Sequence, residues 1–130
     1  MPDILIELAA YLQTGLTETT TVSCYEMADS PAKYVLVQSI PAELPSPPQI
    51  DAISTRIRVT ARDSSNVAAF ALADSCWKLL YEQPPEEPTG FIKLKDTWIF
   101  VDLRGKPVWQ KSDQKGNKYF SFEAIITTAK

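Results

Sequence analysis

The 130-residue sequence contains no histidine, few glycines and only two cysteines. Without imidazole, Ser-His-Asp and Cys-His nucleophilic sites are excluded, as are imidazole metal ligands and the commonest general base at neutral pH. The four glycines, at positions 15, 90, 105 and 116, are too scattered to form a phosphate-binding loop. Two cysteines without histidine cannot complete a standard structural zinc site. We therefore expect no catalytic, cofactor-binding or metal-binding residues and no enzymatic activity.

A long hydrophobic run and a basic charge balance are also missing. The longest nearly unbroken apolar run, Val67 to Ala73, is far shorter than the roughly 20 residues that span a bilayer. No basic region precedes the first apolar residues, so no signal peptide is predicted. We expect a soluble, cytoplasmic protein with no membrane partner, in which Cys24 and Cys76 are free thiols in preference to a disulfide. The net charge of −3 makes nucleic acid a poor candidate partner.

What the chain does contain is enough apolar sequence for one core. With 45% apolar residues, we predict a single domain over residues 1–130. Asp3 is a plausible N-cap for a helix over about residues 4–14, which Gly15 ends. A longer helix is predicted over Val67 to Glu82. Apart from one narrow polar stripe this helix is apolar, so we expect most of its circumference to be covered.

The remaining segments predict strands, which are separated in two places by proline-rich connections. Tyr34 to Val37 is apolar without alternation, as in a strand covered on both faces or a short central strand, and we expect it in the middle of the sheet. Ile53 to Arg62 alternates between a core face and a polar face. Further strands are predicted over Phe91 to Lys95, Trp98 to Leu103, Val108 to Lys111 and Lys118 to Thr128, the last two forming a hairpin.

The order of these elements predicts an α+β fold, with a mostly antiparallel β-sheet, two main helices packed on it and a C-terminal hairpin region. The connections over residues 41–48 and 83–90 contain too many prolines for a helix or a central strand. The second connection holds the adjacent acids Glu86 and Glu87, which we interpret as solvated surface because nothing there would desolvate a catalytic carboxylate.

Several exposed-looking side chains are candidates for contact with a subunit or a partner protein. The arginines on the polar face of the 53–62 strand must face water, pair with acids or meet a partner. Trp109 in its short hairpin strand either anchors a contact or covers a small core. A proline-stiffened loop becomes ordered at low entropic cost when a partner arrives. The candidate contact residues are Pro45, Pro47, Pro48, Arg56, Arg58, Arg62, Trp109 and Lys111.

Phe70, Trp77 and Tyr81 lie on one flank of the long predicted helix, beside its polar stripe. Two interpretations are open. The default is packing in the core or against the other helix, and the alternative is a subunit interface.

Three segments carry a resemblance to a known family: Asp3-Ile-Leu-Ile-Glu-Leu-Ala-Ala-Tyr-Leu, the strand-to-helix segment 57–74, and Asp113-Gln-Lys-Gly-Asn-Lys-Tyr-Phe-Ser-Phe-Glu-Ala-Ile. In this layout the chain resembles the tail terminator and minor capsid proteins at the neck of long-tailed bacteriophages. The resemblance implies a homo-oligomeric ring of six subunits that binds the finished end of the tail tube and stops its polymerisation. It also implies contact with a head connector protein, passage of DNA without specific binding, and a place in the virion after assembly in the host cytoplasm.

Two other classes of function remain open. One is a monomeric adaptor or inhibitor module that holds a single protein partner with the same hairpin surface. The other is an enzyme, but no spacing of acidic, lysine, tyrosine or cysteine residues in the sequence favours one.

Overall fold

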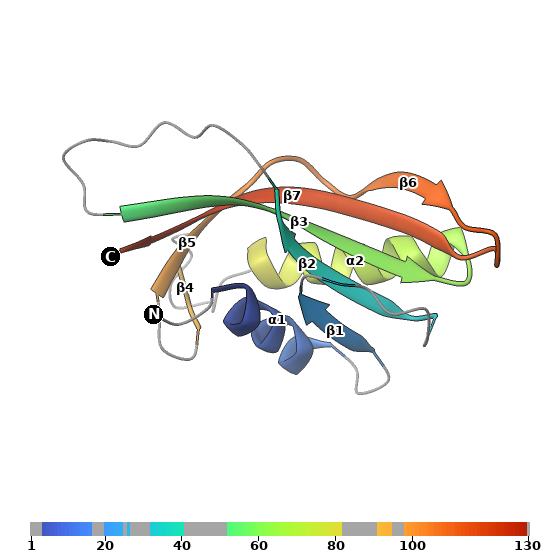
Figure 1. The fold of residues 1–130 in the computed structure, drawn as a ribbon, viewed down its shortest axis with the longest axis horizontal. Coiled ribbons are helices and arrows are strands. Elements are labelled where there is room, and N and C mark those ends of the chain that lie inside the picture. Colours follow the sequence, from blue (N-terminus) through green and yellow to red (C-terminus); the bar gives the residue numbers. More distant parts are fainter. Residues whose placement is uncertain are drawn as a thin grey trace.

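A computed structural model describes residues 4–16, 20–24, 26, 32–40, 52–81, 91–94 and 98–129. Its helices are α1 (Ile4–Gly15) and α2 (Asn66–Tyr81). Its strands are β1 (Thr21–Cys24), β2 (Tyr34–Ser39), β3 (Ala52–Asp63), β4 (Phe91–Lys93), β5 (Trp98–Leu103), β6 (Val108–Ser112) and β7 (Lys118–Ala129). Figure 1 shows both helices on the same side of the sheet.

The strands form one sheet in the order β1-β2-β3-β7-β5-β4, and β6 pairs with β7 off this path. The β1–β2 pair is parallel, and the other pairs of described strands are antiparallel. The predicted α+β fold is confirmed, as is the predicted hairpin between β6 and β7. The interior position predicted for Tyr34 to Val37 is confirmed too, because β2 lies between β1 and β3.

Helix α1 forms because its apolar residues recur at helical spacing and meet the sheet. Leu5, Leu8 and Leu12 are buried on one face. The helix extends one residue beyond the predicted end and includes Gly15. A Cβ atom at Gly15 would lie 2.5 Å from the Leu79 side chain, so this glycine lets α1 approach α2 closely. The Tyr11 hydroxyl donates a hydrogen bond of 2.8 Å to the Leu79 carbonyl and ties the two helices together.

The core lies between the helices and the inner face of the sheet. Alternate residues of β3 point into it, and Ile57, Val59 and Ala61 are each 0% exposed, as their alternation predicted. The neighbouring strand β7 adds Phe122 and Ile126 to the same face. This alternation fixes the register of the central strands, because a slip by one residue would move every buried side chain to the other face.

Helix α2 begins after Ser65, whose hydroxyl accepts a hydrogen bond of 3.1 Å from the Ala68 amide. The prediction that most of its circumference is covered is wrong. Val67 is 82% exposed, Phe70 45% and Tyr81 62%. Both helices lie in a single layer beneath the sheet, and no other described element covers the outer side of α2.

Other predictions concern the connections and the cysteines. The proline-rich connections at 41–48 and 83–90, including Glu86 and Glu87, fall outside the described residues.

Cys24 and Cys76 are free thiols, as predicted. Cys76 is buried in the core, and burial raises the pKa of its thiol to about 12. Among the described residues, no helix is both long and apolar enough to cross a membrane.

Candidate protein-interaction surfaces

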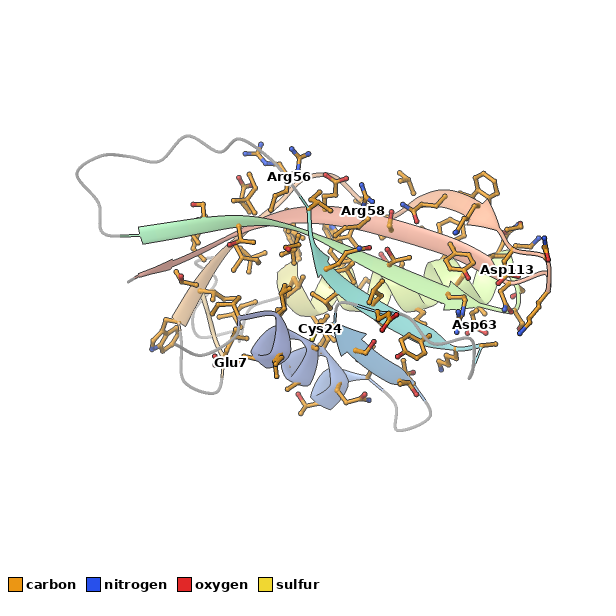
Figure 2. The ribbon with its side chains drawn as sticks, in the orientation of Figure 1. Glu7, Cys24, Arg56, Arg58, Asp63 and Asp113 are labelled. Atoms are coloured by element: carbon orange, nitrogen blue, oxygen red, sulfur yellow. The ribbon has the colours of Figure 1, made fainter. Side chains whose placement is uncertain are left out.

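The face of the sheet opposite the helices carries all three predicted arginines, at alternating positions of β3, but only Arg56 and Arg58 are partly exposed. Figure 2 shows Arg56 and Arg58 on this open face, pointing away from the helices. Both guanidinium groups pair with Glu123 on the adjacent strand β7. Arg56 Nη2 lies 2.7 Å from Glu123 Oε1, and Arg58 Nη2 lies 3.2 Å from Glu123 Oε2. Of the alternatives for these arginines, pairing with an acid therefore holds for Arg56 and Arg58.

Glu123 is held ionised by this arrangement. Its partial burial raises the pKa of the carboxyl, but hydrogen bonds and charges from Arg58 and Arg56 outweigh that effect, so the net pKa lies below the usual value of 4.5. The two arginines and one carboxylate leave one excess positive charge. This open face therefore stays electropositive on a chain whose net charge is −3.

Arg62 lies in a different environment from the other two arginines. It is 3% exposed, its Nε atom donates to the Ala32 carbonyl at 3.0 Å, and its guanidinium lies 5.4 Å from the Tyr34 ring centroid and 5.9 Å from that of Tyr119. A side chain this buried offers almost no surface to a partner. The expectation that Arg62 contacts a partner is therefore corrected. This arginine holds neighbouring segments of the face together, through cation–π contacts with Tyr34 and Tyr119 and its hydrogen bond to Ala32.

Aromatic side chains of α2 and of the β6–β7 hairpin form an aromatic flank along one side of the helix, which we define as Phe70, Trp77, Tyr81, Trp109 and Phe120. The Phe70 and Phe120 rings meet edge-on with centroids 5.6 Å apart, and the Trp77 and Tyr81 rings stack with centroids 4.7 Å apart. The Trp77 indole donates to the Gly105 carbonyl at 3.0 Å. Core packing, the default interpretation of these helix aromatics, is wrong for Phe70 and Tyr81, which are exposed, and holds in part for half-buried Trp77.

Trp109 extends this aromatic flank onto the hairpin. It is paired directly with Phe120 across the β6–β7 ladder, so the two side chains lie on the same face of the sheet. Trp109 is 55% exposed and does not close a core. The ladder has a bulge between Trp109 and Lys111, which places Lys111 on the open face opposite Tyr119. The Lys111 Nζ atom lies 4.9 Å from the Tyr119 ring centroid.

The hairpin turn is organised by Asp113. One of its carboxylate oxygens, Oδ1, accepts hydrogen bonds of 2.9 Å from the Lys115 and Asn117 amides, and the other, Oδ2, accepts one of 3.1 Å from the Tyr119 hydroxyl. Gly116 has a φ of +84°, which an L side chain rarely adopts. Slight desolvation raises the pKa of Asp113, and these hydrogen bonds, with that of Asn117 Nδ2, lower it below the usual 3.8.

The proline candidates and possible metal ligands complete the survey of the predicted sites. Pro45, Pro47 and Pro48 lie outside the described residues. Within the described ranges, no group of three or more cysteine, aspartate or glutamate side chains is placed to hold a metal ion.

Reasoning from the sequence missed Glu123, which lies 65 positions from Arg58 along the chain. It also missed Phe120, whose alternation with Phe122 was a usable signal.

Comparison with known proteins leaves the family open. The sequence matches no protein-family model, and no curated protein matches it significantly.

Proposed function

We propose that the protein is a structural assembly subunit of a tailed bacteriophage, a tail terminator or a related neck protein, that forms a ring at the end of the tail tube. The observation that supports this proposal is the exposure of large apolar side chains on two opposite faces of one small domain. The aromatic flank lies on the helix side of the sheet. Trp98 and Phe100, 52% and 39% exposed, belong to β5 positions that face the open side.

Two different apolar patches suit a ring better than a symmetric dimer. In a closed ring each contact is heterologous, so one patch of a subunit meets a different patch of its neighbour. Tryptophan and tyrosine are the residues that most often dominate the energy of such contacts. In the proposed arrangement the aromatic flank, including Trp109, packs against the Trp98 region of the next subunit. Six subunits and a central passage for DNA follow from the family resemblance.

Mixing two defective variants tests the head-to-tail contact. Trp109→Ser removes one patch and Trp98→Ser the other, so neither variant alone assembles. A mixture retains one intact pair of patches and is expected to give a one-to-one heterodimer in native mass spectrometry. The native chain is expected to give a closed ring in native mass spectrometry and negative-stain microscopy. Lys78→Gln, an exposed helix variant, is the matched control and should assemble like the native chain. A native chain that stays monomeric at high concentration contradicts the ring.

The biological role needs a separate assay. Purified tail tube protein from the same phage is allowed to polymerise with and without this chain. A terminator shortens the tubes and is seen at one end by microscopy. A gene position next to a major tail protein gene supports the same role. Tubes of unchanged length, together with a one-to-one complex between this chain and some other protein, favour the alternative of a monomeric adaptor or inhibitor.

A further inference from the structure

A polar groove crosses the open face of the sheet, on the side away from the aromatic flank. Its volume is about 280 Å³. The groove is lined by side chains of β2, β3, β6 and β7, including Gln38, Arg58, Arg62, Lys111 and Tyr119. Because the bulge in β6 adds one residue there, Gln110 also borders the groove. No part of the proposed ring contact above uses these side chains.

The groove concentrates positive charge on an acidic protein. Arg58, Arg62 and Lys111 line it, and no carboxylate does so among the described residues. Glu123 lies beside the groove and neutralises part of the charge of Arg56 and Arg58. The Lys111 ammonium lies over the Tyr119 ring at the groove wall, and no described carboxylate forms an ion pair with it.

Arg58 is incompletely satisfied in this setting. One of its nitrogens, Nη2, bonds to Glu123 at 3.2 Å, but its buried Nε atom has no hydrogen-bond acceptor among the described residues. A buried donor without an acceptor is unfavourable, and arginine prefers two parallel hydrogen bonds to one carboxylate. Its side chain is 35% exposed and lines the groove, so part of the guanidinium is open to a carboxylate that enters there.

We infer that this groove binds an acidic side chain of a peptide segment belonging to another protein. The carboxylate lies between Arg58 and Lys111, the amide side chain of Gln38 pairs with the peptide backbone, and Leu36 and Tyr119 accept an apolar neighbour. The groove is near the lower limit of about 300 Å³ for ligand pockets, a size that fits one or two side chains. This inference goes beyond the proposed ring and does not depend on it.

A peptide fits better than a nucleic acid for an electrostatic reason. A nucleic acid gains its affinity from many phosphate contacts spread along its backbone, and the groove offers three cations in one place only. A single carboxylate responds to the local charges of the groove. The amide and apolar groups beside those charges also match a peptide backbone and side chain, whereas a strand of DNA needs a continuous basic track.

The test measures binding of a fluorescent, capped decaglutamate peptide by anisotropy, with decaglutamine and a ten-nucleotide thymidine strand as comparison probes. Lys111→Gln removes one cation. Gln38→Glu places a carboxylate directly across the ladder from Arg58, where it competes for the site. Each variant is expected to weaken decaglutamate binding about tenfold, the loss of one charge-assisted hydrogen bond. Lys78→Gln, which removes the same charge from α2, is the matched control and leaves the affinity unchanged.

Thermal melts show that the variants fold, and Gln38→Glu is expected to melt no lower than the native chain because it supplies Arg58 with an acceptor. The inference is overturned if both groove variants bind decaglutamate like the native chain, or if the thymidine strand binds more tightly at equal ionic strength. It is also overturned if the variants change only the oligomeric state, since a second copy would then occupy the groove. If the native chain is strictly monomeric and still binds the peptide, the ring is contradicted but this inference is supported.

Discussion

The pairing of Glu123 with two arginines gives the sharpest prediction about stability. Glu123→Gln keeps the size of the side chain but removes the charge that faces Arg56 and Arg58. Each of these ion pairs is about one-third exposed, so each contributes about 0.2–1 kcal/mol and not the larger value of a buried pair. The variant should therefore lower the free energy of unfolding at pH 7 by about 1 kcal/mol, which corresponds to a melting point lower by roughly 3–5 °C.

The effect has a defined pH dependence. The folded pKa of Glu123 lies below its usual value of 4.5, so the stabilisation is complete above that pH and is lost as the pH falls through the folded pKa. The stability difference between the native chain and Glu123→Gln should therefore be constant from pH 7 to 5 and shrink in more acidic solution. Added salt should reduce it as well.

Urea unfolding at a series of pH values, followed by tryptophan fluorescence, measures this difference. Glu26→Gln is the matched control, because Glu26 is exposed and no described ion pair involves it. Its stability should equal that of the native chain at every pH. The reasoning is refuted if Glu123→Gln is as stable as the native chain at pH 7, or if the difference between them does not change as the pH is lowered.

Three further predictions follow from local geometry. Gly15→Ala places a Cβ against the terminal methyl groups of Leu79 and should destabilise the fold by about 1 kcal/mol in urea unfolding, in spite of the better helix propensity of alanine. Asp113→Ala removes the acceptor for the hairpin amides and should lower the melting temperature more than Asp113→Asn does. At pH 8, iodoacetamide should alkylate half-buried Cys24 in the native protein and leave Cys76 unmodified until urea unfolds the chain, as peptide mass spectrometry would show.

The elements of the fold were predictable because each has its own local signal. The alternation in β3 identified Ile57, Val59 and Ala61 as core residues, and the predicted limits of β5 are those of the structure. The Asp113 turn also has a readable signal, an aspartate followed by a glycine three residues later. Such signals depend on neighbours within a few positions along the chain.

What failed depended on neighbours distant in sequence. Alternation placed Arg62 on a polar face, but Tyr34 and Tyr119 from two other strands enclose it. The apolar composition of α2 indicated a covered helix, whereas the number of layers decides what covers it, and no local pattern encodes that number. The partner of Arg58 could not be identified because strand order determines that β3 lies beside β7.

Strand β7 links the two candidate surfaces in a fixed geometry. Successive side chains alternate across the sheet, so Phe120 joins the aromatic flank while Tyr119 and Glu123 face the open side. Because β7 pairs with β3 along all 12 of its residues, both surfaces are built on one continuous ladder. A ring built through the aromatic flank and Trp98 leaves the groove open only if the neighbouring subunit does not reach Lys111. Equal decaglutamate affinity for the ring and for monomeric Trp109→Ser would show that the groove stays accessible, and weaker binding by the ring would show that the neighbour covers it.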